Sequence, residues 1–241
     1  MANKKSNMYT DTKTWNPFVG CLHNCIYCVP SFQQQVKRWG KKHCHYCYTY
    51  YPHYHPDRLN KIPSAENIFV CGDGDIAFCD TFYLDEVVQQ ISLHNKKCAY
   101  KTYYFQSKDW KSAKRVVYYL ERENIKNAII IETLETNRDE GYTLISMAPS
   151  PTKRHYAFLE VNYPKKAITA EPLLNFDIDI FFKMLTEVEP EYVWIGYNSK
   201  PNRVQLPEPD LEKTVQLIRD LKNSGIKVRG KNLRGINVNE V

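Results

Sequence analysis

The sequence has no long apolar run, and this absence excludes one class of protein. Its longest apolar segments, such as Ala128 to Ile131, are a few residues long, far short of the ~20 residues that a helix needs to cross a bilayer. A secretory segment is also missing at the start, where the chain reads MANKKSN and no apolar region follows. We therefore expect a cytoplasmic protein without a membrane partner.

Low-complexity tracts and a strong excess of one charge are likewise missing. Charged residues make up 25% of the 241 residues and hydrophobic residues 43%, which is typical of a folded domain. A chain of this size buries roughly 70–75% of its surface on folding and needs no disulfide to be stable. The net charge of +6 is spread along the chain. By themselves, basic residues distributed in this way indicate solvent-exposed surfaces more often than a nucleic-acid site.

Cysteine, by contrast, is abundant. The chain has eight cysteines, and in a reducing compartment we expect their thiols to remain free. A reduced set of this size indicates metal or redox chemistry instead of a disulfide framework.

Six short segments, rich in β-branched or aromatic residues, alternate along the chain with longer amphipathic segments. The short segments, which we expect to be strands, cover residues 67–71, 101–106, 128–132, 167–171, 192–196 and 226–229. The longer segments, which we expect to be helices, cover residues 84–94, 111–123, 151–161, 179–187 and 210–223. If residues 12–17 form another strand, there are seven. This alternation predicts an α/β fold with parallel strands, in a sheet that is open or closes into a barrel.

Three residues fit the ends of these helices. Asp109 and Asp177 stand where an N-cap carboxylate accepts the free N–H groups of a first helical turn. Gly225 stands where a residue in the left-handed conformation ends the last helix.

The region from Gly20 to Glu66 interrupts the alternation. It holds five cysteines, five histidines and the tyrosine-rich run Tyr48-Thr49-Tyr50-Tyr51-Pro52. No internal repeat, glycine-rich linker or shift of composition marks a second domain. We predict one domain over residues 1–241, with a Cys/His/Tyr-rich insertion at about 29–66 after the first strand.

Cys21, Cys25 and Cys28 form a C-x3-C-x2-C spacing directly after the first possible strand. Three thiolates this close together can hold three irons of a 4Fe-4S cluster, because soft sulfur ligands suit iron and a short loop can wrap around the cluster. The fourth iron then keeps an open coordination position, which catalysis needs. A zinc site, or three buried apolar thiols, is the alternative interpretation of this spacing.

This motif, with the aromatic Tyr27 directly before the last cysteine, resembles the signature of the radical S-adenosylmethionine (SAM) superfamily. Within that superfamily the sequence is most similar to a phage-associated family of uncharacterised function. The matching segments cover most of the chain, from about Thr14 to Arg234, in the family's order. They are Trp15-Asn16-Pro17 with Gly20-Cys21, His55-Pro56 with Arg58-Leu59, Ile68-Phe69-Val70 followed by Gly74-Asp75, Glu171-Pro172, and Gly196-Tyr197.

The resemblance implies a partial (βα)6 TIM-like barrel that binds a 4Fe-4S cluster through Cys21, Cys25 and Cys28. In the superfamily, SAM chelates the open iron, and the reduced cluster cleaves it to methionine and a 5′-deoxyadenosyl radical that abstracts hydrogen from the substrate. The resemblance also implies a flavodoxin or ferredoxin-like electron donor, and it places Tyr27 near the adenine of SAM.

Polar residues after the expected strands are the candidates for holding SAM, because the active site of a parallel βα barrel lies at the carboxyl ends of its strands. The loop Gly72-Asp73-Gly74-Asp75 resembles the place where radical SAM enzymes bind the SAM amino group, for which a carboxylate is a suitable acceptor. Glycines there let the backbone approach closely. An ordinary βα turn is the alternative.

Several charged residues and one amide complete this candidate set. Glu132 or Glu135 is expected to hold the ribose hydroxyls, and Lys108, Arg138 or Lys200 the SAM carboxylate. Glu171 ends an apolar strand and is expected to point into the barrel mouth, and Asn198 follows the next strand. For the charged residues, a structural salt bridge is the alternative.

The second cysteine pair admits several interpretations. Val29-Pro30 follows Cys28 where radical SAM proteins of this type often have Tyr-Ala, and Cys44-His45-Tyr46-Cys47 repeats the Cys-x-Tyr-Cys pattern. A cluster on Cys21, Cys44 and Cys47 is therefore a second possibility. Otherwise Cys44 and Cys47 form an accessory site for zinc or a second iron-sulfur cluster, completed by one of the nearby histidines at 43, 45, 53 and 55. A redox dithiol and plain structural thiols are the remaining interpretations.

Two hypotheses of function follow. The first is a radical SAM enzyme whose substrate we expect to be a nucleic acid or nucleotide, because the basic segments at 108–115 and 222–234 are expected to flank the barrel mouth. The second is a non-catalytic module that recognises nucleic acid through a zinc-organised insertion. The first predicts iron in the protein, and the second predicts zinc.

Overall fold

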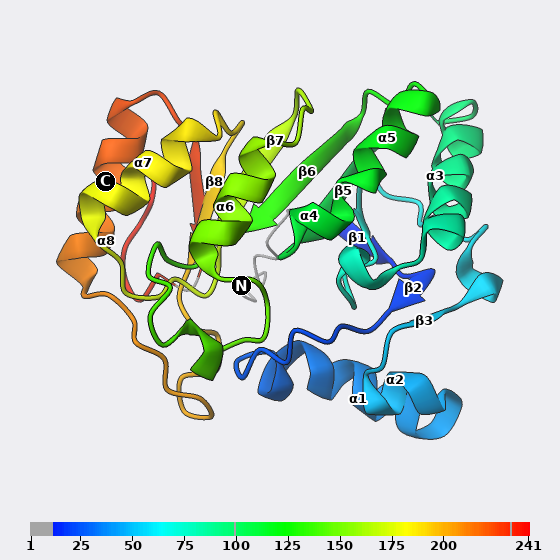
Figure 1. Cartoon of the computed structure of the whole chain (residues 1–241), viewed down its shortest axis with the longest axis horizontal. Helices are drawn as coiled ribbons and strands as arrows, with labels where there is room; N and C mark the ends of the chain where they lie inside the picture. The colour runs from blue at the N-terminus through cyan, green and yellow to red at the C-terminus, as the bar shows by residue number, and fades with distance from the viewer. Residues whose placement is uncertain (1–11, 99, 232) are drawn as a thin grey trace, which may run out of the picture.

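The computed structural model describes residues 12–98, 100–231 and 233–241. Within them, seven parallel strands form one sheet whose strand order follows the chain (Figure 1). These strands are β1 (Thr12–Trp15), β4 (Asn67–Val70), β5 (Thr102–Ser107), β6 (Ala128–Thr133), β7 (Lys166–Ala170), β8 (Val193–Gly196) and β9 (Val228–Lys231). The sheet is curled into a half-barrel. The predicted α/β fold with parallel strands is therefore confirmed, the seventh strand is present, and the other six lie within a residue or two of their expected bounds.

The two faces of the sheet bury different side chains, because successive residues of a strand point to opposite sides. In β6, Ile130 packs into the main core that the helices cover, whereas Ile129 and Ile131 join a smaller apolar cluster. Tyr104 and Trp194 belong to that smaller cluster. Every residue of β6 is buried, which is typical of a central strand in a parallel sheet.

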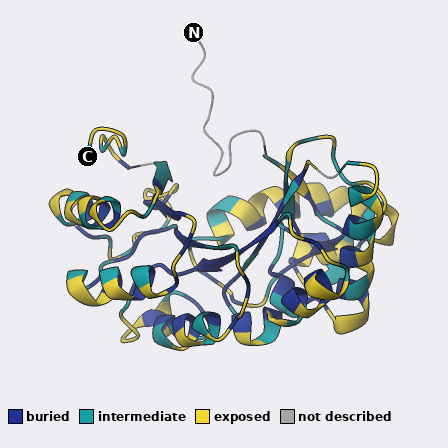
Figure 2. Ribbon diagram, turned by 90° about the horizontal axis from the view of Figure 1, so that it is seen from above, coloured by how far each residue is buried: buried dark blue, intermediate teal, exposed yellow. Residues whose placement is uncertain are grey.

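Helices connect the successive strands and turn their buried faces toward the sheet (Figure 2). They are α3 (Thr81–Asn95), α4 (Trp110–Ala113), α5 (Arg115–Arg122), α6 (Pro151–Leu159), α7 (Ile178–Glu187) and α8 (Leu211–Asn223). The helix expected over residues 111–123 is divided into α4 and α5 at Lys114. The longest of the described helices has 15 residues, and none is long and apolar enough to cross a bilayer.

Two of the three predicted helix ends are as expected. The Asp109 carboxylate accepts a hydrogen bond from the Ser112 N–H at 3.2 Å, and Gly225 has a φ of 85° just after α8. Asp177 does precede α7, but its side chain makes no capping bond. Its carboxylate binds Arg138 instead, so the capping interaction predicted for this residue is wrong.

The residues between β1 and β4 fold as a separate layer beyond the carboxyl end of β1, at the bottom of Figure 1. This layer contains β2 (Phe18–Val19), α1 (Gln34–His43), α2 (His45–Thr49) and β3 (His53–Tyr54). Phe18 pairs with Tyr54 and Val19 with His53 in an antiparallel ladder between β2 and β3. Strands of two residues show no apolar alternation, so the sequence does not reveal them. The end of the insertion thereby returns to the strand that leads into the three-cysteine loop.

Candidate functional site

A cavity of about 810 Å³ lies at the carboxyl edge of the parallel sheet. Its size falls within the roughly 300–1,000 Å³ of ordinary small-molecule sites. On the side of the sheet, the residues that line it at or just after a strand end are Gly72, Ser107, Thr133, Glu171, Asn198 and Lys231. On the opposite side, the insertion contributes Val36, Trp39, Cys47 and Tyr50. The cavity thus lies where a parallel βα sheet places its active site.

Cys21, Cys25 and Cys28 all line this cavity. A turn joins the last two, in which the Cys28 N–H donates to the Cys25 carbonyl at 2.9 Å. The Cys25 thiol is buried and lies 3.1 Å from the Ser146 hydroxyl. Burial raises the pKa of the Cys28 thiol to about 11. The structure therefore brings the three predicted cluster ligands to one wall of one cavity.

Close backbone contacts fix the position of the three-cysteine loop. Gly20, at a φ of 103°, donates its N–H to the Asp73 carbonyl at 3.1 Å, and its own carbonyl accepts the Asp75 N–H at 3.2 Å. A Cβ atom on Gly20 would lie 2.4 Å from the Tyr51 carbonyl oxygen, and one on Gly74 would lie 2.6 Å from the Gly20 oxygen. Only glycine allows the insertion, the cysteine loop and the loop after β4 to approach this closely.

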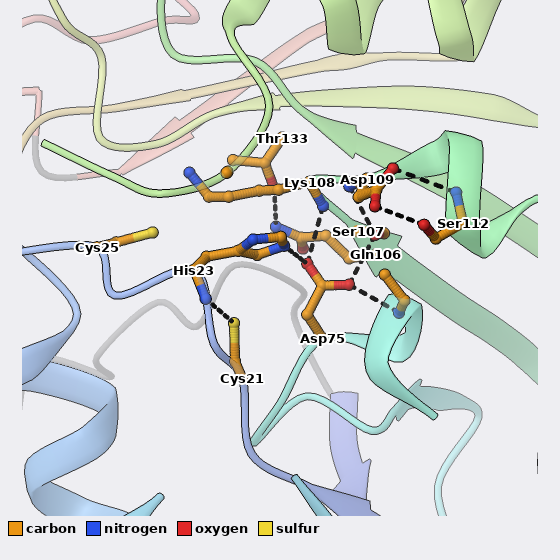
Figure 3. Close-up of polar contacts among 12 residues, drawn as sticks. Cys21, His23, Cys25, Asp75, Gln106, Ser107, Lys108, Asp109, Ser112 and Thr133 are labelled. Carbon is orange, nitrogen blue, oxygen red and sulfur yellow. Dashed lines mark hydrogen bonds and ion pairs between the residues drawn. The ribbon is translucent and has the colours of Figure 1, made fainter. Parts of the chain in front are cut away.

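Asp75 holds the loop after β4 against its neighbours (Figure 3). Its carboxylate accepts hydrogen bonds from the Ser107 hydroxyl at 2.6 Å, the Lys108 N–H at 2.9 Å and the Ala77 N–H at 3.0 Å, and it lies 3.1 Å from His23 Nε2. Burial acts to raise the pKa of Asp75, but these hydrogen bonds hold it below the usual value. Because both oxygens have protein partners, Asp75 acts as a positioning residue in this structure.

Asp73 is the other carboxylate of this loop, and it also lines the cavity. It accepts a hydrogen bond from the Asn16 amide at 2.7 Å, and burial raises its pKa. Gly72 lines the cavity beside it, where a Cβ atom would clash with the Phe69 ring. Of the two aspartates, Asp73 is the one with fewer protein partners.

Glu135 is the centre of a buried ionic network. One of its oxygens accepts hydrogen bonds from the Tyr27 hydroxyl at 2.6 Å and from the Lys108 ammonium. The other accepts from Arg154 at 2.7 Å, and the Tyr142 hydroxyl is 3.1 Å from the first. Burial acts to raise the pKa of Glu135, but Arg154 and Lys108 lower it far below the usual value. Glu135 itself does not line the cavity, whereas Tyr27 and Lys108 do.

Two members of this network, Tyr142 and Arg154, were not predicted from the sequence. Arg154 belongs to α6 and is 1% exposed, and nothing in the sequence of that helix distinguishes it from a surface arginine. A fully buried cation needs a carboxylate partner. Arg154 can be identified as the partner of Glu135 only once the fold is known.

Glu132 is fully buried but does not line the cavity. Neither of its carboxylate oxygens has a hydrogen-bond partner among the described residues. Burial raises the pKa of Glu132 to about 8, although Arg154 nearby acts to lower it. Glu132 and Glu135 are thus buried and do not line the cavity, and a role in holding ribose hydroxyls remains a prediction for them.

Glu171 and Asn198 both line the cavity, as expected of residues that follow β7 and β8. Glu171 accepts a hydrogen bond from the Trp194 indole at 2.8 Å and lies 3.7 Å from the Lys231 ammonium. Burial raises its pKa. The Asn198 amide donates to the Val204 carbonyl at 2.6 Å, within its own loop. Glu171 therefore forms part of a polar wall of the cavity.

The basic segment at 108–115 does not form a cationic rim. Lys108 is buried in the Glu135 network, and the Arg115 guanidinium donates to the Ala77 carbonyl at 3.1 Å. Lys111 and Lys114 are exposed and do not line the cavity. The cations that do line it next to the sheet, Lys108 and Lys231, already have carboxylate partners.

Four side chains of the insertion form a group that can bind a metal ion. Cys44, Cys47, His53 and His55 bring one ligand atom each within 4.8 Å of one another. His55 directly follows β3. Burial and the nearby Arg58 lower the pKa of His55 to about 4. The spacing of His53 and His55 indicates this pair of histidines, because residues two apart in an extended segment point to the same side.

The ligand atoms of Cys21, His23 and Asp75 also lie within 4.8 Å of one another. In the part of the chain that the structure describes, the sulfurs of Cys21, Cys25 and Cys28 do not converge in this way. A cluster of several irons holds its ligand sulfurs farther apart than a single ion does. The wider spacing is therefore compatible with a cluster.

No protein-family model and no curated protein sequence matches this chain. The case for a function therefore depends on the motif residues of the sequence and on the geometry of the cavity.

Replacing Gly20 should destabilise the protein through the backbone contact. We expect Gly20→Ala to lower the free energy of unfolding by at least ~2 kcal/mol more than Gly235→Ala, measured by urea denaturation, because its Cβ would overlap the Tyr51 carbonyl. Gly235 is a matched control, since its φ of 98° is nearly that of Gly20 but its Cβ would meet nothing within 4 Å. Equal decreases in the free energy of unfolding for the two variants would contradict the close contact between Gly20 and the Tyr51 carbonyl.

The raised pKa of Glu132 predicts a pH-dependent stability. Between the usual carboxyl pKa and about 8 the folded state holds a proton that the unfolded state has lost, so stability falls as the pH rises through this window. Glu132→Gln should therefore raise the Tm on the order of 5 °C at pH 9 and much less at pH 5. Glu140→Gln, at an exposed position, is the control. A gain of the same size at both pH values would contradict the assignment.

Proposed function

We propose that this protein is a radical SAM enzyme with a 4Fe-4S cluster on Cys21, Cys25 and Cys28, built on a partial (βα)6 TIM-like barrel. The observation that carries this proposal is the position of the three thiols. They belong to a C-x3-C-x2-C motif and line a cavity at the carboxyl edge of a curled parallel sheet. A zinc finger or a set of core thiols does not need such a cavity.

The donor set fits the cluster chemically. Three soft sulfur donors suit iron and leave one iron of a cubane without a protein ligand. When bound, the reduced cluster would supply the electron that cleaves SAM. The cavity beside the cysteines is of the size that a small molecule occupies. Its wall on the side of the insertion includes Val36 and Tyr50, which belong to a small apolar cluster.

The chain's own residues would hold and orient SAM. Tyr27 lines the cavity, and Glu135 and Lys108 bind its hydroxyl, which supports a role beside the adenine. Asp73 offers a carboxylate for the SAM amino group. Asp75 supports the same loop by binding Ser107 and the Lys108 N–H.

An electron donor needs access to the cluster. Leu22, Ile26 and Val29 lie within or next to the three-cysteine motif and are 43%, 38% and 50% exposed. Weak electron-transfer complexes use small interfaces, and these exposed side chains beside the cysteines offer such a contact area to a flavodoxin or ferredoxin-like protein. We do not extend the proposal to a nucleic-acid substrate, since Lys108 and Lys231 are the described cations of the two basic segments that line the cavity, and each already has a carboxylate partner.

Anaerobic reconstitution with iron and sulfide tests the proposed function. We expect a brown protein with about four irons per chain beyond any zinc, which forms 5′-deoxyadenosine from SAM and dithionite. Cys25→Ala should abolish this product, because the loop then lacks one ligand. Cys98→Ala, outside the cavity, is the matched control and should keep full activity.

Two results would overturn the proposed function or its ligands. A colourless protein that holds zinc and takes up no iron would favour the non-catalytic zinc module. Full cleavage of SAM by Cys25→Ala would show that the three-cysteine assignment is wrong.

A further inference from the structure

A second group of metal-ligating side chains lies in the insertion, and its geometry is that of a single ion. His53 Nε2 is 3.4 Å from the Cys44 sulfur and 3.3 Å from the Cys47 sulfur. His55 Nε2 is 3.3 Å from the Cys47 sulfur and 2.9 Å from His53 Nε2. A tetrahedral zinc with bonds of about 2.3 Å to sulfur and about 2.0 Å to nitrogen separates its ligands by roughly 3.5 Å for S–N and 3.3 Å for N–N pairs. The four atoms are close to that arrangement.

We propose that Cys44, Cys47, His53 and His55 form a closed structural zinc site that holds the insertion against the three-cysteine loop. This site is independent of the proposed radical SAM activity, since it shares no ligand with Cys21, Cys25 and Cys28.

The orientation of the His53 ring supports this site. His53 Nδ1 lies 2.7 Å from the Tyr51 carbonyl, and a carbonyl can only accept a hydrogen bond. The proton of the neutral ring is therefore on Nδ1, and the Nε2 lone pair points toward the two sulfurs. The nearest carboxylate oxygen to His55 Nδ1, that of Asp57, lies 3.9 Å away, which is beyond hydrogen-bond distance. Outer partners such as the Tyr51 carbonyl commonly orient the histidines that bind a metal.

The four ligand atoms lie close enough together to bind one shared cation. The Nε2 atoms of His53 and His55 face each other, and the Cys47 sulfur is in contact with both. A Zn²⁺ ion with two thiolates and two neutral imidazoles has no net charge, so it can be buried in the apolar surroundings of Val36 and Tyr50 at little electrostatic cost.

The donor set also selects the kind of metal. Two thiolates and two imidazoles in one tetrahedral group suit zinc, whereas magnesium and calcium prefer oxygen ligands. All four positions are taken by the protein, so no position remains for a substrate or a catalytic water. The role of the ion is therefore structural.

The position of the site explains what it would stabilise. Cys44 and Cys47 lie at and within α2, a helix of five residues that is too short to be stable alone. His53 lies in β3, which pairs with β2 directly before Gly20 and the cysteine loop. Because Cys47 and Trp39 line the cavity, the ion would fix the outer wall of the active-site cavity to the strand that carries the cluster ligands.

Metal analysis of the full-length protein tests the site. Protein purified from zinc-supplemented cultures should hold about one zinc per chain, and X-ray absorption should show two sulfur and two nitrogen neighbours. Cys47→Ser and His53→Gln should lower the zinc content at least about tenfold. Cys79→Ser and His45→Gln are the matched controls and should keep it. Cys21→Ser should also keep zinc while losing iron, which separates this test from that of the proposed function.

Hydrogen exchange keeps the test informative if a variant fails to fold. Treating the wild-type protein with a strong zinc chelator should remove the amide protection of residues 34–55 and leave that of β5 and β6 unchanged, and added zinc should restore it. A protein without zinc, zinc that survives both Cys47→Ser and His53→Gln, or equal exchange with and without the chelator would each overturn the proposal.

Discussion

The candidate site depends on a place where three backbone segments meet with no room for a side chain. Gly20 stands between the Tyr51 carbonyl and the loop that contains Gly74, and both glycines lie where a Cβ atom would overlap backbone atoms. This contact joins the insertion, the cysteine loop and the carboxyl end of β4. The insertion is thereby held close to the edge of the sheet, where its residues form the wall of the cavity opposite the strand ends.

Much of the fold could be predicted from the sequence because the sheet has a strong local signal. Buried parallel strands are short, apolar and β-branched, as in the run that forms β6, and the amphipathic helices between them have a different period. β2 and β3 could not be predicted in this way. Each has two residues, and their pairing is a long-range contact between Val19 and His53 that the local sequence does not encode.

Within the candidate site, the cysteine motif could be predicted from the sequence more fully than the residues expected to hold SAM. Spacing alone brought Cys21, Cys25 and Cys28 together, since residues this close in sequence must share a loop. The residues expected to hold SAM differ in whether they reach the cavity, and most of them lie after the strand ends, where the conformation of each loop decides this. Asp73 and Glu171 face the cavity, whereas Glu132 and Glu135 are buried behind it. Arg154, the partner of Glu135, comes from a helix that follows β6 and has no local signal.

The Glu135 network has a consequence for the electrostatics of the cysteine loop. Two cations, Lys108 and Arg154, share the single carboxylate of Glu135, while burial favours the neutral form of Glu132. Asp75 adds a second ionised carboxylate beside Lys108, because its hydrogen bonds hold its pKa below the usual value, so the two cations of this corner are balanced. Burial raises the pKa of the Cys28 thiol, whereas Lys108 acts to lower it. The cation therefore makes the thiolate of Cys28, the form that binds a metal, less costly to form than burial alone would allow.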